Sequence, residues 1–293
     1  LMSNTYVGRA EEPDPRILWV ADIGIINGFA LHPNGNVFAY KSNPIHWSNP
    51  ISQDNTMFEI DGKTGKVIKK YPIIKDSLKS QEIKHLDVSD DGQYLAINGG
   101  YLYEFQTEKI YKFGGAGYVK FIPNTNILAY ASWDDNEGRN PSIVMLNIET
   151  KEKKTIYTGE EDIHRIAFSP DGKYMATGGT KETSGGDYYT VFKLWDAQKL
   201  TLIQELKRYD DRYNSQPKIK FSPDSKTLCI NPGDGLMFFE LNNYSFTKNI
   251  YKAGRYEFIN DSLMVYSNVN VNMKILNYIN FTEVAVIGNY NPY

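Results

Sequence analysis

The chain has 293 residues, 41% of them hydrophobic, which is enough for one large all-β domain or two ordinary domains. Its formal net charge of −3 argues against nucleic-acid binding, because phosphate recognition needs a surplus of Lys and Arg on one face. The single cysteine, Cys229, excludes an internal disulfide and a cysteine-rich zinc site.

No apolar run is long enough to cross a bilayer, so we expect no membrane insertion. No secretory signal is visible at Leu1, and we expect a cytoplasmic protein. A signal peptide that had been removed would instead make the protein periplasmic or secreted.

A repeated turn organises the chain. Six times an apolar strand ends in a tight turn rich in Pro, Asn, Asp or Gly and returns as a second apolar strand. The residues that end these first strands are Leu31, Val88, Phe121, Phe168, Phe221 and Phe258. Their spacings of 57, 33, 47, 53 and 37 residues scatter around the forty-odd residues of a four-stranded propeller blade.

Two further strands follow the second strand in each repeat. The third strands are predicted at 56–61, 101–105, 142–148, 191–196, 236–241 and 273–278. An outer strand comes next, as at 65–68 and 281–286. Apolar and polar residues alternate along it, as expected of an edge strand with one face in solvent.

A single four-stranded sheet cannot bury both of its faces, whereas sheets stacked radially bury each face against a neighbour. The sequence therefore predicts an all-β fold, a β-propeller of six four-stranded blades. Seven blades would result if the strand at 17–20 belonged to an additional blade. We expect an N-terminal tail at 1–15 and a single propeller domain over 16–293.

Two segments carry a family resemblance. The Phe-Ser-Pro-Asp-Gly turn within 168–176, followed by Phe-Lys-Leu-Trp-Asp at 192–196, resembles a WD repeat of the β-propeller class. The turn at 221–226 is similar. Only the fourth repeat keeps the Trp-Asp pair, as Trp195 and Asp196, and the Gly-His dipeptide is missing everywhere. The family's His-Asp-Ser-Trp hydrogen-bond network therefore cannot be assigned to this chain.

A TolB-like six-bladed propeller is the rival interpretation. It has the same Ser-Pro-Asp-Gly turns, and the segment 129–135 leading to 143–145 also resembles it. Both resemblances imply a protein that binds rather than one that catalyses.

Loop lengths distinguish the two faces of the predicted disc. The turns between first and second strands are all short, whereas insertions at 41–55, 133–140, 180–189 and 207–214 lie on the opposite face. Loops longer than their connection needs are often functional, although loops also simply tolerate insertion. We predict that a partner binds this face at Trp47, Trp133, Asp134, Asp135, Arg139, Tyr188, Tyr209 and Tyr213.

The titratable residues show no catalytic or metal-binding pattern. Acidic residues gather at 134–137, 160–162, 182 and 187, but they lack the spacing of a calcium loop, and a solvated acidic rim explains them better. The four histidines lack zinc spacing, and no nucleophile elbow or phosphate-binding glycine loop is present. We therefore predict no enzyme activity, no cofactor and no metal.

The sequence favours a non-catalytic scaffold that binds a protein or peptide on its loop-rich face. The acidic loops favour a basic partner. Two alternatives stay open: a propeller enzyme or small-ligand binder that uses the central channel, and a structural subunit of a larger assembly.

Overall fold

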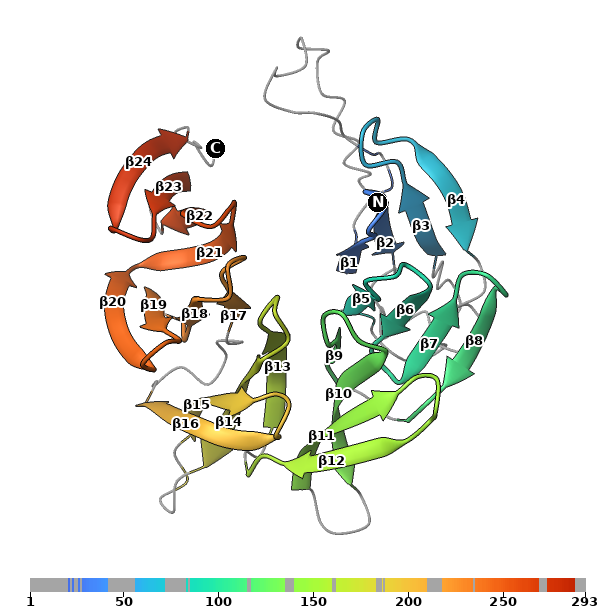
Figure 1. Ribbon diagram of the computed structural model, residues 1–293. Helices are drawn as coiled ribbons and strands as arrows, with labels where there is room; N and C mark the ends of the chain where they lie inside the picture. The colour runs from blue at the N-terminus through green and yellow to red at the C-terminus, as the bar shows by residue number, and fades with distance from the viewer. Residues whose placement is uncertain are drawn as a thin grey trace, which may run out of the picture. The chain divides into compact units, whose positions relative to one another are not determined.

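The computed structural model describes residues 21, 23, 26, 28–41, 56–71, 83, 85–114, 117–134, 140–159, 162–182, 186, 188–209, 218–233, 235–268 and 273–287. Every regular element among them is a β-strand, and the strands form six four-stranded antiparallel sheets (Figure 1). We number these sheets 1 to 6 in chain order. The described residues contain no helix that could cross a membrane.

The chain divides into two compact units, Leu1–Lys84 and His85–Tyr293. The first unit holds sheet 1, whose strands follow chain order: β1 (Gly28–Leu31), β2 (Val37–Lys41), β3 (Thr56–Ile60) and β4 (Val67–Tyr71). Ala39, Phe58 and Ile60 form its buried core. The outer strand β4 is exposed except at Tyr71, as expected of a solvated edge.

The second unit holds sheets 2 to 6, each again with its strands in chain order. Sheet 2 comprises β5 (Leu86–Val88), β6 (Tyr94–Ile97), β7 (Tyr101–Glu104) and β8 (Lys109–Lys112), and sheet 3 comprises β9 (Val119–Phe121), β10 (Ile127–Asp134), β11 (Asn140–Asn147) and β12 (Lys153–Tyr157). Sheet 4 comprises β13 (Asp162–Phe168), β14 (Tyr174–Glu182), β15 (Tyr188–Asp196) and β16 (Thr201–Tyr209). Sheet 5 comprises β17 (Lys218–Phe221), β18 (Thr227–Asn231), β19 (Gly235–Glu240) and β20 (Ser245–Tyr251), and sheet 6 comprises β21 (Ala253–Phe258), β22 (Leu263–Asn268), β23 (Met273–Asn277) and β24 (Thr282–Ile287).

Successive sheets of the second unit share their cores. One apolar cluster joins sheet 2 to sheet 3, a second joins sheets 3 and 4, a third joins sheets 4 and 5, and a fourth joins sheets 5 and 6. Between sheets 3 and 4, Ile143 from β11 lies in one cluster with Phe168, Met175 and Trp195. The inner sheets of this unit therefore bury both faces against neighbours, as the blade interpretation requires.

The fold class and the six four-stranded sheets are confirmed. The first strands end at Phe121, Phe168 and Phe221 as predicted, and sheet 6 has its own outer strand. The tail at 1–15 and the additional strand at 17–20 lie outside the described residues. The single propeller domain over 16–293 stays a prediction.

The insertions were predicted to be loops, but their described residues belong to strands. β10 continues to Asp134 and β11 begins at Asn140, while β14 reaches Glu182 and β15 starts at Tyr188. The strands pair to these ends, because pairing satisfies the backbone N–H and C=O groups that an open loop would leave to water. β16 likewise continues to Tyr209. The described residues of these insertions therefore extend the paired strands.

Candidate functional site

A hydrogen-bond network stabilises the turns between first and second strands. Ser169 Oγ donates to Asp171 Oδ1 at 2.6 Å, and Lys173 N donates to the same oxygen at 3.1 Å. Tyr174 N donates to Ser169 Oγ at 2.9 Å, so the buried hydroxyl both donates and accepts a hydrogen bond. The same Ser-to-Asp bond of 2.6 Å recurs in two other turns of the second unit, from Ser89 to Asp91 and from Ser222 to Asp224.

Neighbouring turns are also bonded to each other. Asn124 N donates to Asp90 Oδ2 at 2.5 Å, and Asn124 Nδ2 donates to Pro170 O at 3.4 Å. Asp171 N donates to Ser225 Oγ at 3.0 Å. The turns of sheets 2 to 5 therefore form one continuous bonded row.

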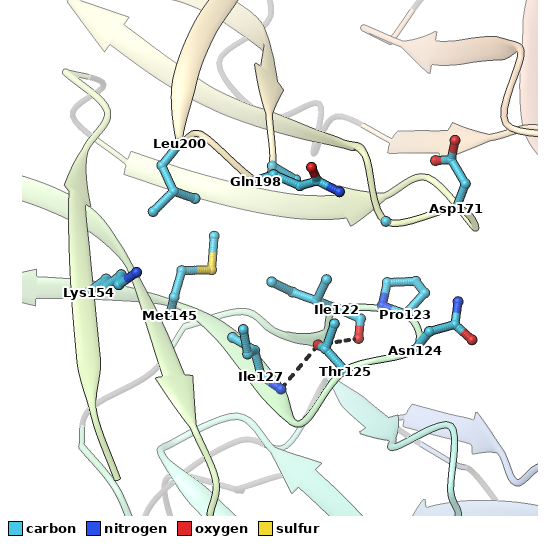
Figure 2. A pocket seen from close by; sticks show the side chains of 12 residues that line it. Ile122, Pro123, Asn124, Thr125, Ile127, Met145, Lys154, Asp171, Gln198 and Leu200 are labelled. Atoms are coloured by element: carbon cyan, nitrogen blue, oxygen red, sulfur yellow. Dashed lines mark hydrogen bonds between the residues drawn. The ribbon is translucent and has the colours of Figure 1, made fainter. Parts of the chain in front are cut away.

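A cavity of about 330 Å³ opens beside this row, between sheets 3 and 4. Figure 2 shows the turn of Pro123 on one side, and the turn of Asp171 with Gln198 and Leu200 of the β15–β16 turn on the opposite side. The residues that line the cavity are Ile122, Pro123, Asn124, Thr125, Ile127, Met145, Lys154, Asp171, Gly172, Ala197, Gln198 and Leu200. We call it the turn-face groove.

The turn-face groove has an apolar floor and a polar rim. Ile122 and Met145 are buried, whereas Lys154 and Gln198 are exposed. Thr125 Oγ1 donates to Ile122 O at 2.9 Å and accepts from Ile127 N at 3.2 Å, so the floor is held by its own turn. Such a groove suits one apolar side chain of a ligand with polar groups beside it.

The carboxylate on the rim stays ionised. Partial burial opposes ionisation of Asp171, but the hydrogen bonds from Ser169 and Lys173 outweigh it and lower the pKa of Asp171. Lys173 Nζ also lies 3.0 Å from Asp171 Oδ2. The Asp171 carboxylate is therefore bound by groups of its own turn. The exposed amine of Lys154 is the other charged group on the rim of the groove.

The partner residues predicted from the sequence fall into two groups. Trp47, Asp135, Arg139 and Tyr213 lie outside the described residues. Trp133 and Asp134 end β10, Tyr188 begins β15 and Tyr209 ends β16, and for these four the backbone alone is described. The pairing of Tyr189 with Tyr209 brings the backbones of Tyr188 and Tyr209 together at one end of sheet 4.

Sequence reasoning missed the turn-face groove. It treated the face with the short turns as the non-functional one, because none of its loops carries an insertion. The available signal was the turn motif itself: the Pro-Asn turn at 123–124 and the Pro-Asp-Gly turn at 170–172 build two walls of the groove.

The Trp-Asp pair of the fourth repeat has a clear structural role. Trp195 is buried and its Nε1 donates to Thr177 Oγ1 at 3.1 Å, so one Trp-to-hydroxyl bond of the type expected in the family network is present with a threonine. Asp196 Oδ1 accepts from Lys199 N at 2.8 Å and from Gln198 N at 3.1 Å. These bonds, the first of them above all, lower the pKa of Asp196.

The histidines and the cysteine also have structural surroundings. His164 Nδ1 lies 3.5 Å from Asp162 Oδ2, and His32 Nδ1 accepts from Asn34 N at 3.2 Å. Cys229 is buried, and burial raises the pKa of its thiol. Within the described ranges, no group of three or more His, Cys, Asp or Glu side chains is arranged to hold a metal ion.

Comparison with known proteins identifies one repeat. Residues 151–187 match the family model described as WD domain, G-beta repeat. The match covers β12, β13 and β14 and ends just before β15, so it does not include Trp195. No curated protein matches the chain. Together, the WD repeat at 151–187 and the six four-stranded antiparallel sheets fit a WD-repeat β-propeller.

Proposed function

We propose that the protein is a non-catalytic scaffold that binds a protein or peptide partner. WD40 repeats generally mediate protein–protein interactions, and WD40 domains are typically non-catalytic. The WD repeat at 151–187 is the observation that carries the proposal.

The long hairpins of sheets 3 and 4 are the proposed binding platform. β10 and β11 have eight residues each and β14, β15 and β16 have nine each, whereas β6 and β7 of sheet 2 have four each. Their ladders continue to the strand ends, at the pairs Asp134–Asn140 and Glu182–Tyr188. A platform that is already ordered loses little conformational entropy on binding, which favours affinity.

The predicted partner residues supply suitable chemistry at these ends. Trp133, Tyr188 and Tyr209 are residue types enriched among interface hot spots. Asp134 and Asp135 add negative charge, which would speed the encounter with a basic partner. We therefore place the partner on the hairpin ends of sheets 3 and 4, with Arg139 as a further contact.

The test begins with a partner isolated by affinity purification and then expressed as a pure protein. Trp133→Ala with Tyr188→Ala should weaken its binding at least about tenfold, because anchor residues of this type carry most of an interface's energy. Phe246→Ala with Tyr251→Ala is the matched control, since both aromatic side chains are exposed on β20 of sheet 5. Titration calorimetry would measure the affinities, and thermal unfolding would check the fold.

Charge-reversal variants test whether the acidic residues speed association and which face the partner binds. Asp134→Lys with Asp135→Lys should mainly slow association and reduce its dependence on salt. Substitution of Lys154 by Glu and Gln198 by Arg changes the turn-face groove instead, and should leave partner binding unchanged. Loss of binding from the groove variants alone would show that the wrong face was chosen, and turnover of a small substrate would overturn the scaffold proposal.

A further inference from the structure

The turn-face groove offers an apolar surface that the partner site on the hairpin ends leaves unused. Five apolar residues from sheets 3 and 4 contribute to its lining: Ile122, Ile127, Met145, Ala197 and Leu200. All five are buried or half-buried. An apolar side chain that entered the groove would remove both its own surface and this lining from water, which is the main favourable contribution to most protein associations.

The walls of the groove are fixed by contacts between the two turns. Asn124 Nδ2 donates to Pro170 O at 3.4 Å and so ties the turn of sheet 3 to the turn of sheet 4. Gly172 has a φ of +69°, and a Cβ added there would lie 3.4 Å from Pro123 O. The turns are therefore in close contact, and a ligand would not have to order them, which limits the entropy lost on binding.

The volume of the groove limits what can occupy it. About 330 Å³ is close to the lower end of the range for small-molecule sites, roughly 300–1,000 Å³. Asn124, Lys154 and Gln198 on the rim are exposed, so the groove is open to solvent. This combination suits one bulky side chain of a segment whose backbone passes over the rim.

The charged groups on the rim differ in how they are engaged. Among the described residues, no ion pair or side-chain hydrogen bond holds the Lys154 ammonium. Asp171 Oδ1 accepts from Ser169 Oγ and Lys173 N, and Asp171 Oδ2 lies 3.0 Å from Lys173 Nζ. Its carboxylate is thus occupied by its own turn. Lys154 is the rim cation that stays available to a ligand.

The available cation lies at one end of the apolar floor. Lys154 is the register partner of Met145 in the β11–β12 ladder. Figure 2 shows Lys154 and Met145 at one end of the groove, and Asn124 and Asp171 at the other. An acidic group on a ligand would therefore be attracted to the Lys154 end and repelled from the Asp171 end, which fixes the direction in which the ligand lies.

We propose that the turn-face groove docks a short protein segment in which a bulky aliphatic side chain stands next to an aspartate or glutamate. The aliphatic side chain fills the floor between Ile122, Met145 and Leu200, and the neighbouring carboxylate pairs with Lys154. The groove lies on the face of the short turns, so this segment is a second ligand in addition to the partner on the hairpin ends.

Selection of random heptapeptides displayed on phage against the immobilised full chain tests this proposal. The peptides that bind the wild-type chain better than the Lys154→Glu variant should share an aliphatic residue next to Asp or Glu. In calorimetric titration of one such synthetic peptide, Lys154→Glu should weaken binding at least about tenfold. Lys109→Glu is the matched control, because Lys109 is an exposed cation on the outer strand β8 of sheet 2, and it should leave binding unchanged.

Charge exchange gives a readout that a structural defect would not produce. The same peptide with its acidic residue replaced by lysine should bind the Lys154→Glu variant more tightly than it binds the wild-type chain. Replacement of its aliphatic residue by alanine should weaken binding to the wild-type chain. Trp133→Ala with Tyr188→Ala should not change the affinity for the peptide, so this test is independent of the partner on the hairpin ends.

Three results would overturn the proposal. The first is a selection in which no peptide distinguishes the wild-type chain from Lys154→Glu. The second is a set of distinguishing peptides without an acidic residue, which would contradict the assigned ligand chemistry. The third is a dimer in sedimentation of the full chain that Lys154→Glu dissociates, which would assign the groove to a second copy.

Discussion

At the scale of single residues, polar side chains in the second unit mostly satisfy the backbone of their own turn. Asp196 accepts two backbone N–H groups of the β15–β16 turn, and Asn147 does the same after β11. Trp195 is the clearest exception, because its indole bonds to the side chain of Thr177 on the neighbouring strand. That bond lies in the buried core between sheets.

Thr177→Val tests the value of this bond. The substitution keeps the shape of the side chain but leaves the buried indole N–H of Trp195 without its acceptor, so unfolding should become about 1–3 kcal/mol easier. Urea denaturation would measure the loss. Thr155→Val, on the exposed outer strand β12, should change stability by no more than about 0.5 kcal/mol. Equal effects of the two substitutions would mean that the indole bond contributes nothing.

At the scale of elements, the sheets of the second unit hold together through the apolar clusters between them. Phe168 ends the first strand of sheet 4 and is 7% exposed, and Trp195 on the third strand is 5% exposed. Both belong to the cluster that also contains Ile122 and Ile143 of sheet 3. Both side chains therefore pack between sheets 3 and 4.

Phe168→Ala should destabilise the protein by about 3–5 kcal/mol, because it leaves a cavity in a close-packed core that relaxes only in part. Trp195→Ala should cost a comparable amount. Phe246→Ala provides the contrast, since its ring is 52% exposed on an outer strand and should cost about 1 kcal/mol or less. Chemical denaturation of the three variants would decide, and a loss below about 1 kcal/mol at Phe168 would contradict the packing.

At the scale of the whole chain, acid should weaken the fold through carboxylates in turns of both units. Hydrogen bonds lower the pKa of Asp61, Glu104 and Asp196, and they do so for Asp171 against the effect of burial. The unfolded chain then takes up protons at a higher pH than the folded chain. The stability that these groups supply is present above about pH 4 and is lost as pH falls through their folded pKa values.

Burial raises the pKa of Asp87, which acts in the opposite direction, so a single-site variant gives the cleaner test. Asp171→Asn cannot titrate at this position. Its loss of stability between pH 6 and pH 3 should be smaller than that of the wild-type chain, as measured by urea unfolding at both pH values. A loss equal to that of the wild type would show that Asp171 titrates alike in the folded and unfolded states.

The sequence by itself determined the number of sheets and their strands. Ser169 and Asp171 illustrate why: the hydroxyl and the carboxylate hydrogen-bond within one turn, to partners that lie within five residues. Local geometry of this kind is encoded by neighbouring residues, so the turns and the four strands around each of them were predictable. The ends of the long hairpins were not, because pairing extended β10 and β14 into segments that resemble loops by composition.

Only the tertiary structure decided which distant residues meet. Asn124 bonds to Pro170 across 46 residues, beside the turn-face groove, and Arg165 Nη1 lies 3.3 Å from His85 Nε2 across 80 residues. No local propensity encodes these contacts, since they follow from how one sheet packs on the next through side chains that fill the space between them. The sequence therefore predicted the sheets and their turns, whereas packing between the sheets decided where a groove would arise.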